Sequence, residues 1–224
     1  LPLVESALQR KALAYDKAGE EHYNLISAFH KSMRGSDPDA ALYWLIRMMD
    51  AGEDPLYIAR RMVRFASEDI GNADPDALQT ALSALEAYRM LGSPEGELAL
   101  AQSAIYLATA PKSNSIYRAY QAAQATIKET GALPVPLHIR NAPTKLMRSM
   151  GYGKDYRYAH DYADAFVDQD YLPEKIRTRS FYIPTDRGYE SKIQMRIEKW
   201  RSARLQRNPE AQSHDPKKEK KESE

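Results

Sequence analysis

The sequence has no cysteine among its 224 residues, which excludes disulfide bonds, zinc–thiolate sites and cysteine nucleophiles. It also lacks any apolar run near the ~20 residues that a membrane-spanning helix needs. Its longest such run covers only 40–46. The net charge of +1 gives no overall attraction to nucleic acid or to anionic lipid, so either contact would need a local patch. These absences predict a soluble, cytoplasmic protein.

The chain begins at Leu1 and shows no signal peptide, and this beginning predicts a fragment of a longer protein. A Gly-x-x-x-x-Gly-Lys-Ser/Thr phosphate loop is absent, because 151–155 ends on aspartate and lacks the earlier glycine. None of the five histidines forms a His-x-x-x-His or Glu-x-x-His pair of the kind that converges on a metal. The sequence therefore predicts no catalytic residue, bound cofactor or metal in this chain.

Four junctions of shared chemistry divide the first half of the chain. They are Gly35-Ser36-Asp37-Pro38, Gly52-Glu53-Asp54-Pro55, Gly71-Asn72-Ala73-Asp74-Pro75 and Gly92-Ser93-Pro94. Glycine tolerates the left-handed conformation that ends a helix, Asp or Ser accepts the free amides of the next helix, and proline suits its first turn. Each junction therefore predicts the end of one helix and the start of another, folded back on its neighbour.

The segments around these junctions have helical periodicity, which predicts an all-α fold. The expected helices are 3–15, 20–33, 40–49, 56–70, 78–88, 98–108, 116–127, 144–150 and 191–204. Residues 40–49 are apolar on nearly every side, so we place that helix at the centre. The inward stripe of the 98–108 helix is predicted to be Leu98, Ala101, Ile105 and Ala108. The segments differ in sequence, which favours a bundle over a repeat array.

After Gly131 the chain becomes rich in proline and tyrosine, with seven of the fifteen tyrosines between 152 and 189. We expect an irregular segment before the last helix and a disordered charged tail at 208–224. Tyrosine is common at protein interfaces. The candidate interface aromatics are Tyr152, Tyr156, Tyr158 and Tyr162. The alternative is that this segment packs on its own bundle.

Five basic residues form the other candidate site, a patch for DNA or subunit contact. They are Lys31, Arg34, Arg60, Arg61 and Arg64. The alternative is a solvated helix face on which Lys31 and Arg34 complement a helix C-terminus. Glu68 is expected to pair with Arg64, four residues earlier, and Asp69 to support the turn. Residues 112–114 resemble a helix cap whose free amides could also hold an anion.

Several motifs together resemble the family of replication-associated recombination protein A, the bacterial relatives of Werner-helicase-interacting protein. The resemblance covers about residues 10–200. It includes 15–23, 26–45, Gly52-Glu53-Asp54-Pro55, Ala66-Ser67-Glu68-Asp69-Ile70-Gly71, Pro111-Lys112-Ser113-Asn114, Val135-Pro136-Leu137-His138, Gly151-Tyr152-Gly153-Lys154 and Tyr171-Leu172-Pro173. Runs of this length are specific.

The resemblance implies the C-terminal part of a clamp-loader-like AAA+ ATPase that acts at replication forks. It implies that ATP and magnesium bind to an N-terminal domain that this chain lacks, and that the helical part resembles the clamp-loader collar. It further implies a homotetramer, fork DNA and single-stranded DNA-binding protein as partners, and a bacterial, nucleoid-associated location. The expected organisation is a lid or linker helix at 1–16, an oligomerisation domain at 17–132, an extension packed on the bundle at 133–207 and the tail.

Two functions follow as hypotheses. The first is an assembly module that tetramerises and arranges the ATPase domains around DNA. The second is a DNA- or partner-binding module that uses the five basic residues. An independent enzyme is a weak third, because no nucleophile–base pair or metal cluster is visible.

Overall fold

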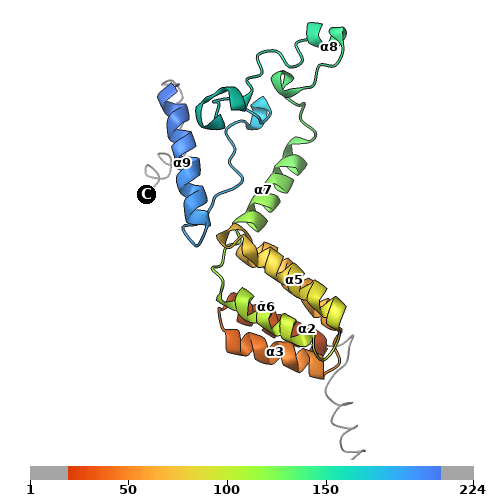
Figure 1. The fold of residues 1–224 in the computed structure, drawn as a ribbon. Helices are drawn as coiled ribbons and strands as arrows, with labels where there is room; N and C mark the ends of the chain where they lie inside the picture. The colour runs from red at the N-terminus through yellow and green to blue at the C-terminus, as the bar shows by residue number, and fades with distance from the viewer. Residues whose placement is uncertain (1–19, 208–224) are drawn as a thin grey trace, which may run out of the picture. The chain divides into compact units, whose positions relative to one another are not determined.

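The computed structural model describes residues 20–207, and every regular element in that range is helical, as predicted (Figure 1). The main helices are α2 (Glu20–Arg34), α3 (Pro38–Asp50), α4 (Pro55–Phe65), α5 (Asp76–Leu91), α6 (Glu97–Thr109), α7 (Ser115–Thr130), α8 (Lys145–Ser149) and α9 (Glu190–Arg207). Short helical turns are η1 (Ala66–Ile70), η2 (Gly71–Ala73), η3 (Leu137–Ile139), η4 (Ala159–Asp161), η5 (Ala163–Ala165) and η6 (Glu174–Ile176). The helix expected at 3–15 and the tail expected at 208–224 lie outside the described residues.

The described chain forms two compact units. The bundle unit contains the residues up to Tyr120 together with Pro184–Lys192, and the second unit contains Gln121–Ile183 with the rest of α9. The division falls inside α7 and inside α9. A short segment from late in the sequence is therefore part of the bundle unit. The domain boundaries expected from the sequence, and the packing of the extension on the bundle, stay predictions.

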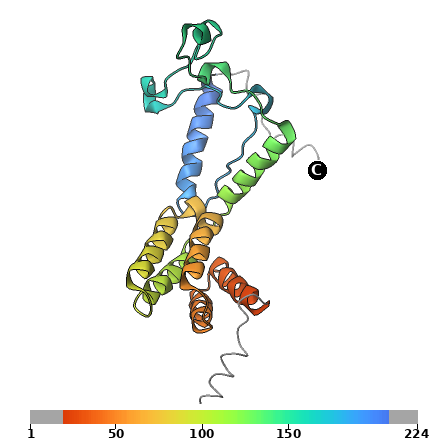
Figure 2. The same cartoon turned by 90° about the vertical axis from the view of Figure 1, so that its right-hand side faces the viewer.

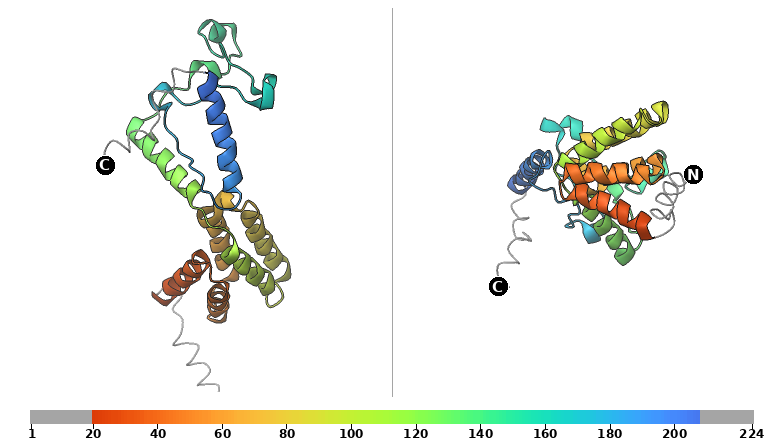
Figure 3. Two further views of the ribbon diagram at one scale, coloured as in Figure 1. Left: turned by 90° about the vertical axis from the view of Figure 1, so that its left-hand side faces the viewer. Right: turned by 90° about the horizontal axis from the view of Figure 1, so that it is seen from below.

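The bundle unit is built from α2 to α6 around one apolar core (Figure 1). α3 packs against both α2 and α6, and its place beside α2 is clear from below (Figure 3). α5 packs against α4 and α6, which Figure 2 shows from the side. The largest fully buried apolar side chains are Phe29, Met33, Leu45, Met48, Ile58, Met62, Phe65, Ile70, Leu100 and Leu107.

Capping chemistry fixes the starts of α3 and α4 as the junctions predict. Asp37 accepts a hydrogen bond from the amide of Ala40, and Asp54 accepts one from the amide of Leu56, both at 2.9 Å. A proline follows each aspartate at the first helical position. Such caps typically contribute about 1 kcal/mol each, so these two starts are set locally.

Two junctions differ from the prediction. At the first, Ser36 rather than Gly35 adopts the left-handed conformation, with φ of 61°. At the fourth, Ser93 does not cap α6: its hydroxyl bonds the Tyr88 hydroxyl at 2.9 Å, and α6 begins only at Glu97.

The central placement of 40–49 is also wrong, since Tyr43 and Ile46 of α3 are 60% and 52% exposed. α3 has neighbours on two sides and solvent on the rest.

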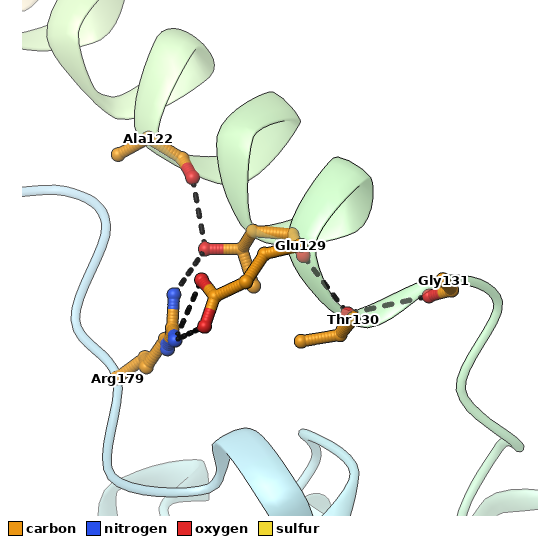
Figure 4. Close-up of polar contacts among 6 residues, drawn as sticks. Ala122, Glu129, Thr130, Gly131 and Arg179 are labelled. Atoms are coloured by element: carbon orange, nitrogen blue, oxygen red, sulfur yellow. Dashed lines mark hydrogen bonds and ion pairs between the residues drawn. The ribbon is translucent and has the colours of Figure 1, made fainter.

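Apart from the end of α7, α8 and most of α9, the second unit consists of short helical turns and irregular chain. This is expected from its proline and tyrosine content. Arg179 joins the chain before α9 to α7: its guanidinium donates to the Thr126 hydroxyl and to both Glu129 oxygens, each at 2.9 Å (Figure 4). Phe166 stacks on Trp200 of α9 with ring centroids 6.0 Å apart. These contacts hold the irregular segments to two helices of the same unit.

Candidate interaction surfaces

Three of the five residues in the predicted basic patch face a carboxylate. Arg34 donates to both Asp69 oxygens, at 2.5 and 3.1 Å. Arg64 donates to Glu68 at 2.7 Å, as expected, whereas Arg60 reaches Asp54 only at 3.5 Å. The other two residues are Lys31, which is exposed, and Arg61, which is partly buried. The structure therefore places this basic face beside its own counter-charges.

Two of these carboxylates, Glu68 and Asp69, come from η1, a π-helical turn that continues α4 without a break. The wider turn carries Glu68 toward Arg64 of α4 and Asp69 toward Arg34 of α2. Single π turns inside helices occur frequently at functional sites. The prediction that Asp69 only supports a turn missed its bidentate bond to Arg34, because periodicity does not reveal a π turn.

His30 lies beneath this face and is buried, in edge contact with the Phe29 and Phe65 rings. Burial, followed by the nearby positive charge of Arg61, lowers the His30 pKa from 6.5 to about 4. The imidazole is therefore neutral at physiological pH. Its Nε2 is buried and has no hydrogen-bond partner in the described structure. The sequence signal for its burial is helical spacing, since His30 lies four residues after Ile26 and three before Met33, both of which are buried.

Glu190, the first residue of α9, is fully buried at the start of α7. The Ser113 hydroxyl donates to its Oε2 at 2.7 Å, and the Ser115 hydroxyl donates to its Oε1. The amide and hydroxyl of Thr185 each donate to Oε2 at 2.8 Å. Burial alone would raise the Glu190 pKa, but these hydrogen bonds outweigh it and the pKa lies below its ordinary value.

The chain just before Glu190 lies against the bundle backbone. The Tyr189 amide donates to the Ala73 carbonyl at 2.7 Å, and a Cβ at Gly188 would lie 2.1 Å from the same oxygen. Only glycine fits there. At the 112–114 cap the Ser113 hydroxyl accepts a hydrogen bond from the Ser115 amide at 3.3 Å and donates to Glu190, 77 residues further along the chain. The carboxylate therefore binds hydroxyl groups of this turn rather than its free amides.

α6 is apolar on two sides. Leu100, Ala104 and Leu107 point into the core, whereas Leu98 is 77% and Ile105 is 41% exposed. Of the predicted stripe, Leu98 and Ile105 face outward, whereas Ala108 is fully buried and Ala101 is partly buried against the core. Four residues of α5 are further exposed apolar side chains: Leu78, Leu82, Met90 and Leu91, each at least 40% exposed. α5 and α6 pack on each other, so the α5–α6 surface, as we call these six residues, belongs to one helix pair.

The predicted interface tyrosines lie in the second unit. Tyr156, Tyr158 and Tyr162 are 46%, 54% and 38% exposed, and Tyr152 is partly buried beneath the Arg140 guanidinium, 4.9 Å from its ring centroid. Tyr158 also contacts the His160 ring, with centroids 5.1 Å apart. Their subunit-contact role stays a prediction.

Within residues 20–207 no group of three histidine or acidic side chains is arranged to hold a metal ion. Among the helices described, none has the length and apolar character needed to cross a membrane. The features that remain as candidate sites are surfaces: the basic face on the bundle, the α5–α6 surface and the tyrosine-rich segment.

Comparison with known proteins adds two family matches. The family model for MgsA AAA+ ATPase C terminal matches residues 35–201, and that for a AAA C-terminal domain matches residues 1–34. The first model covers the whole of both units except α2 and the last part of α9. The boundary between the two models falls at the end of α2.

Three curated relatives illustrate the similarity. Replication-associated recombination protein A of Coxiella burnetii is 57% identical over 89% of this chain and 46% of its own length. The protein of the same name from Escherichia coli K12 is 51% identical over 92% and 46%. ATPase WRNIP1 of Dictyostelium discoideum is 52% identical over 79% and 20%. The chain thus spans about half the length of the bacterial relatives.

Proposed function

This chain belongs to the family of MgsA AAA+ ATPase C-terminal domains, and we propose that it is the self-association module of a AAA+ ATPase of DNA replication, recombination and repair. In this proposal four copies assemble in the cytoplasm, near the bacterial nucleoid, and so arrange clamp-loader-like ATPase domains around fork DNA. ATP and magnesium bind to the ATPase domains rather than to this chain. Single-stranded DNA-binding protein is a further proposed partner.

The observation that supports self-association is the outer side of α6. A helix that is apolar all round is stable in water only when both sides are covered. The core covers Leu100, Ala104 and Leu107, but Leu98 and Ile105 remain exposed, as do four apolar side chains of the neighbouring α5. Exposed apolar patches of this kind mark protein interfaces. A second copy of the chain brings a matching surface, since identical subunits most often meet through self-complementary patches.

The oligomeric mass tests this proposal. We expect sedimentation equilibrium of the 224-residue chain to give four times its 25.4 kDa mass. Leu98→Glu and Ile105→Glu should lower that mass, because each would bury a charge in the interface. Ile127→Glu is the matched control: Ile127 is 65% exposed on α7, away from the α5–α6 surface in sequence and unit. A monomer at micromolar concentrations would contradict the proposal.

The alternative function, DNA or partner binding through the basic face of the bundle, has less support. Arg34, Arg60 and Arg64 each face an acidic side chain, and Arg61 is partly buried. Lys31 contributes one exposed charge. A phosphate would have to displace Asp69 or Glu68 before it reached the two best-placed guanidinium groups.

A further inference from the structure

A second basic region, residues 138–158, carries charge that the structure does not neutralise. It holds five Lys or Arg residues against a single carboxylate, Asp155. The five are Arg140, Lys145, Arg148, Lys154 and Arg157. In the described part of the chain none of them forms an ion pair. We call residues 138–158 the basic loop.

Three of the acidic side chains that follow the basic loop pair with cations elsewhere in the same unit. Asp164 pairs with Lys199 of α9 at 2.9 Å. Arg204 of α9 pairs with Asp168 at 2.8 Å and lies 3.7 Å from Asp170. Basic residues of α9 thus pair with three carboxylates that follow the basic loop in the sequence.

Hydrogen bonds to neutral carbonyl groups orient two of the loop's cations without cancelling their charge. Arg140 donates to the Val135 carbonyl at 2.6 Å, and Arg148 donates to the Ala142 carbonyl at 3.3 Å. The loop also closes on itself, because the Gly153 amide donates to the Leu137 carbonyl at 2.9 Å. α8 lies within this closed loop, between Leu137 and Gly153 (Figure 1). The cations are therefore held on an ordered scaffold.

Aromatic rings lie between these charges in the sequence. Tyr156 and Tyr158 flank Arg157, and about half of each tyrosine is exposed to solvent. The guanidinium of Arg140 lies over the Tyr152 ring. Nucleic-acid bases stack on exposed aromatic rings and on guanidinium planes, while lysine and arginine bind the phosphates.

We propose that the basic loop binds single-stranded nucleic acid. Its phosphates lie on Arg148, Lys154 and Arg157, and its bases stack on Tyr156 and Tyr158. A duplex fits less well, because its bases already stack on one another and present no free face to a tyrosine. An acidic peptide would match the charge but would leave the two rings without stacking partners. This site is separate from the α5–α6 surface and does not depend on self-association.

Fluorescence anisotropy of a labelled oligothymidylate of about 20 nucleotides, longer than a typical site of 4–16, tests the proposal on the 224-residue chain. We expect Tyr156→Ala with Tyr158→Ala to weaken binding at least about tenfold, since each stacked base contributes substantially. Tyr156→Phe with Tyr158→Phe keeps the rings and should retain the affinity. This pair separates stacking from the loss of a hydroxyl.

The salt dependence tests the phosphate contacts. Arg148→Gln with Arg157→Gln should make the slope of log affinity against log salt shallower by about 1.4 units, at about 0.7 per contact on a single strand. The matched control is Arg60→Gln with Arg64→Gln on the bundle, which should leave the slope unchanged. Circular dichroism should show the same helix content in every variant.

Any of four binding results would overturn the proposal: no binding of the oligonucleotide at low salt, equal binding after removal of both rings, equal binding of a duplex of the same length, or equal binding of polyglutamate. One result of a mass measurement would also overturn it. The sedimentation mass of each variant is measured on the same samples. If the tyrosine-to-alanine pair breaks the assembly, the tyrosines are subunit contacts, as the sequence suggested, and the nucleic-acid site falls. If the original chain has the mass of a monomer but still binds the oligonucleotide, the self-association proposal fails and the nucleic-acid proposal stands.

Discussion

The basic face of the bundle and the basic loop contain five cationic side chains each, yet they differ in what lies beside them. On the bundle, η1 brings Glu68 and Asp69 to within 2.7 Å of two arginines. In the basic loop the cations contact carbonyl oxygens or solvent, and basic residues of α9 pair with three of the carboxylates that follow in the sequence. A count of basic residues ranks the two regions equally. Only the placement of the acids distinguishes a surface that stabilises the fold from one that remains available for a partner.

The largest expected effect concerns His30, whose pKa is lowered first by burial and then by the nearby charge of Arg61. The His30 pKa is about 4 in the folded state and 6.5 in the unfolded state, so between these values the unfolded chain binds more protons. The stability should therefore fall by up to about 3 kcal/mol as the pH drops from 6.5 to 4. Urea unfolding across this range measures it.

His30→Phe should remove most of that pH dependence, because phenylalanine does not titrate and suits the contact with Phe29 and Phe65. His160→Phe is the matched control, since His160 is exposed and lies outside the apolar core. If His30→Phe shows the same pH profile as the original chain, His30 does not cause this pH dependence.

A smaller effect is expected when the counter-charges of the bundle are removed. Glu68→Gln with Asp69→Asn should lower the stability by about 1 kcal/mol, since partly exposed ion pairs contribute little. The same change exposes Arg34 and Arg64 to solvent as unpaired cations. We expect the affinity for the oligothymidylate to rise severalfold, as measured by anisotropy. Unchanged affinity would mean that the carboxylates do not keep this face from binding phosphate.

The smallest expected effect comes from the reverse change in the basic loop. Ser149→Glu puts a carboxylate next to Arg148 and four residues after Lys145, within reach on α8. It should weaken oligothymidylate binding a few-fold, while the stability changes by less than about 0.5 kcal/mol, as for most surface substitutions. Ser149→Gln controls for side-chain size. Equal binding by both variants would show that net charge in the basic loop is irrelevant.

Local chemistry made much of the fold predictable. The aspartates and prolines at 37–38 and 54–55 set helix starts because their partners lie within three residues. The same rules failed where the chain had a second choice: Ser93 bonds Tyr88 instead of capping α6. The inward side of α6 could not be deduced either, since Leu98 and Leu100 are equally apolar and only tertiary packing decides between them.

The candidate sites were less predictable, because their defining contacts are remote in sequence. Arg34 meets Asp69 across 35 residues, and Lys199 meets Asp164 across the same separation. Spacing rules for helices apply within one or two turns and do not reach so far. Basic residues could be found from the sequence, but not which of them the fold would neutralise.

The position of Glu190 has a consequence for the order in which the protein is made. Ser113 and Ser115 leave the ribosome long before the carboxylate that binds them, and the core helices are complete by Thr109. Chains fold from the N-terminus during synthesis, so the bundle forms while the hydroxyls of Ser113 and Ser115 still lack the Glu190 carboxylate. The bundle unit is completed only when the segment around Glu190 has been made. A truncation anywhere between Tyr120 and Pro184 would therefore release a bundle that keeps its core but permanently lacks its last segment.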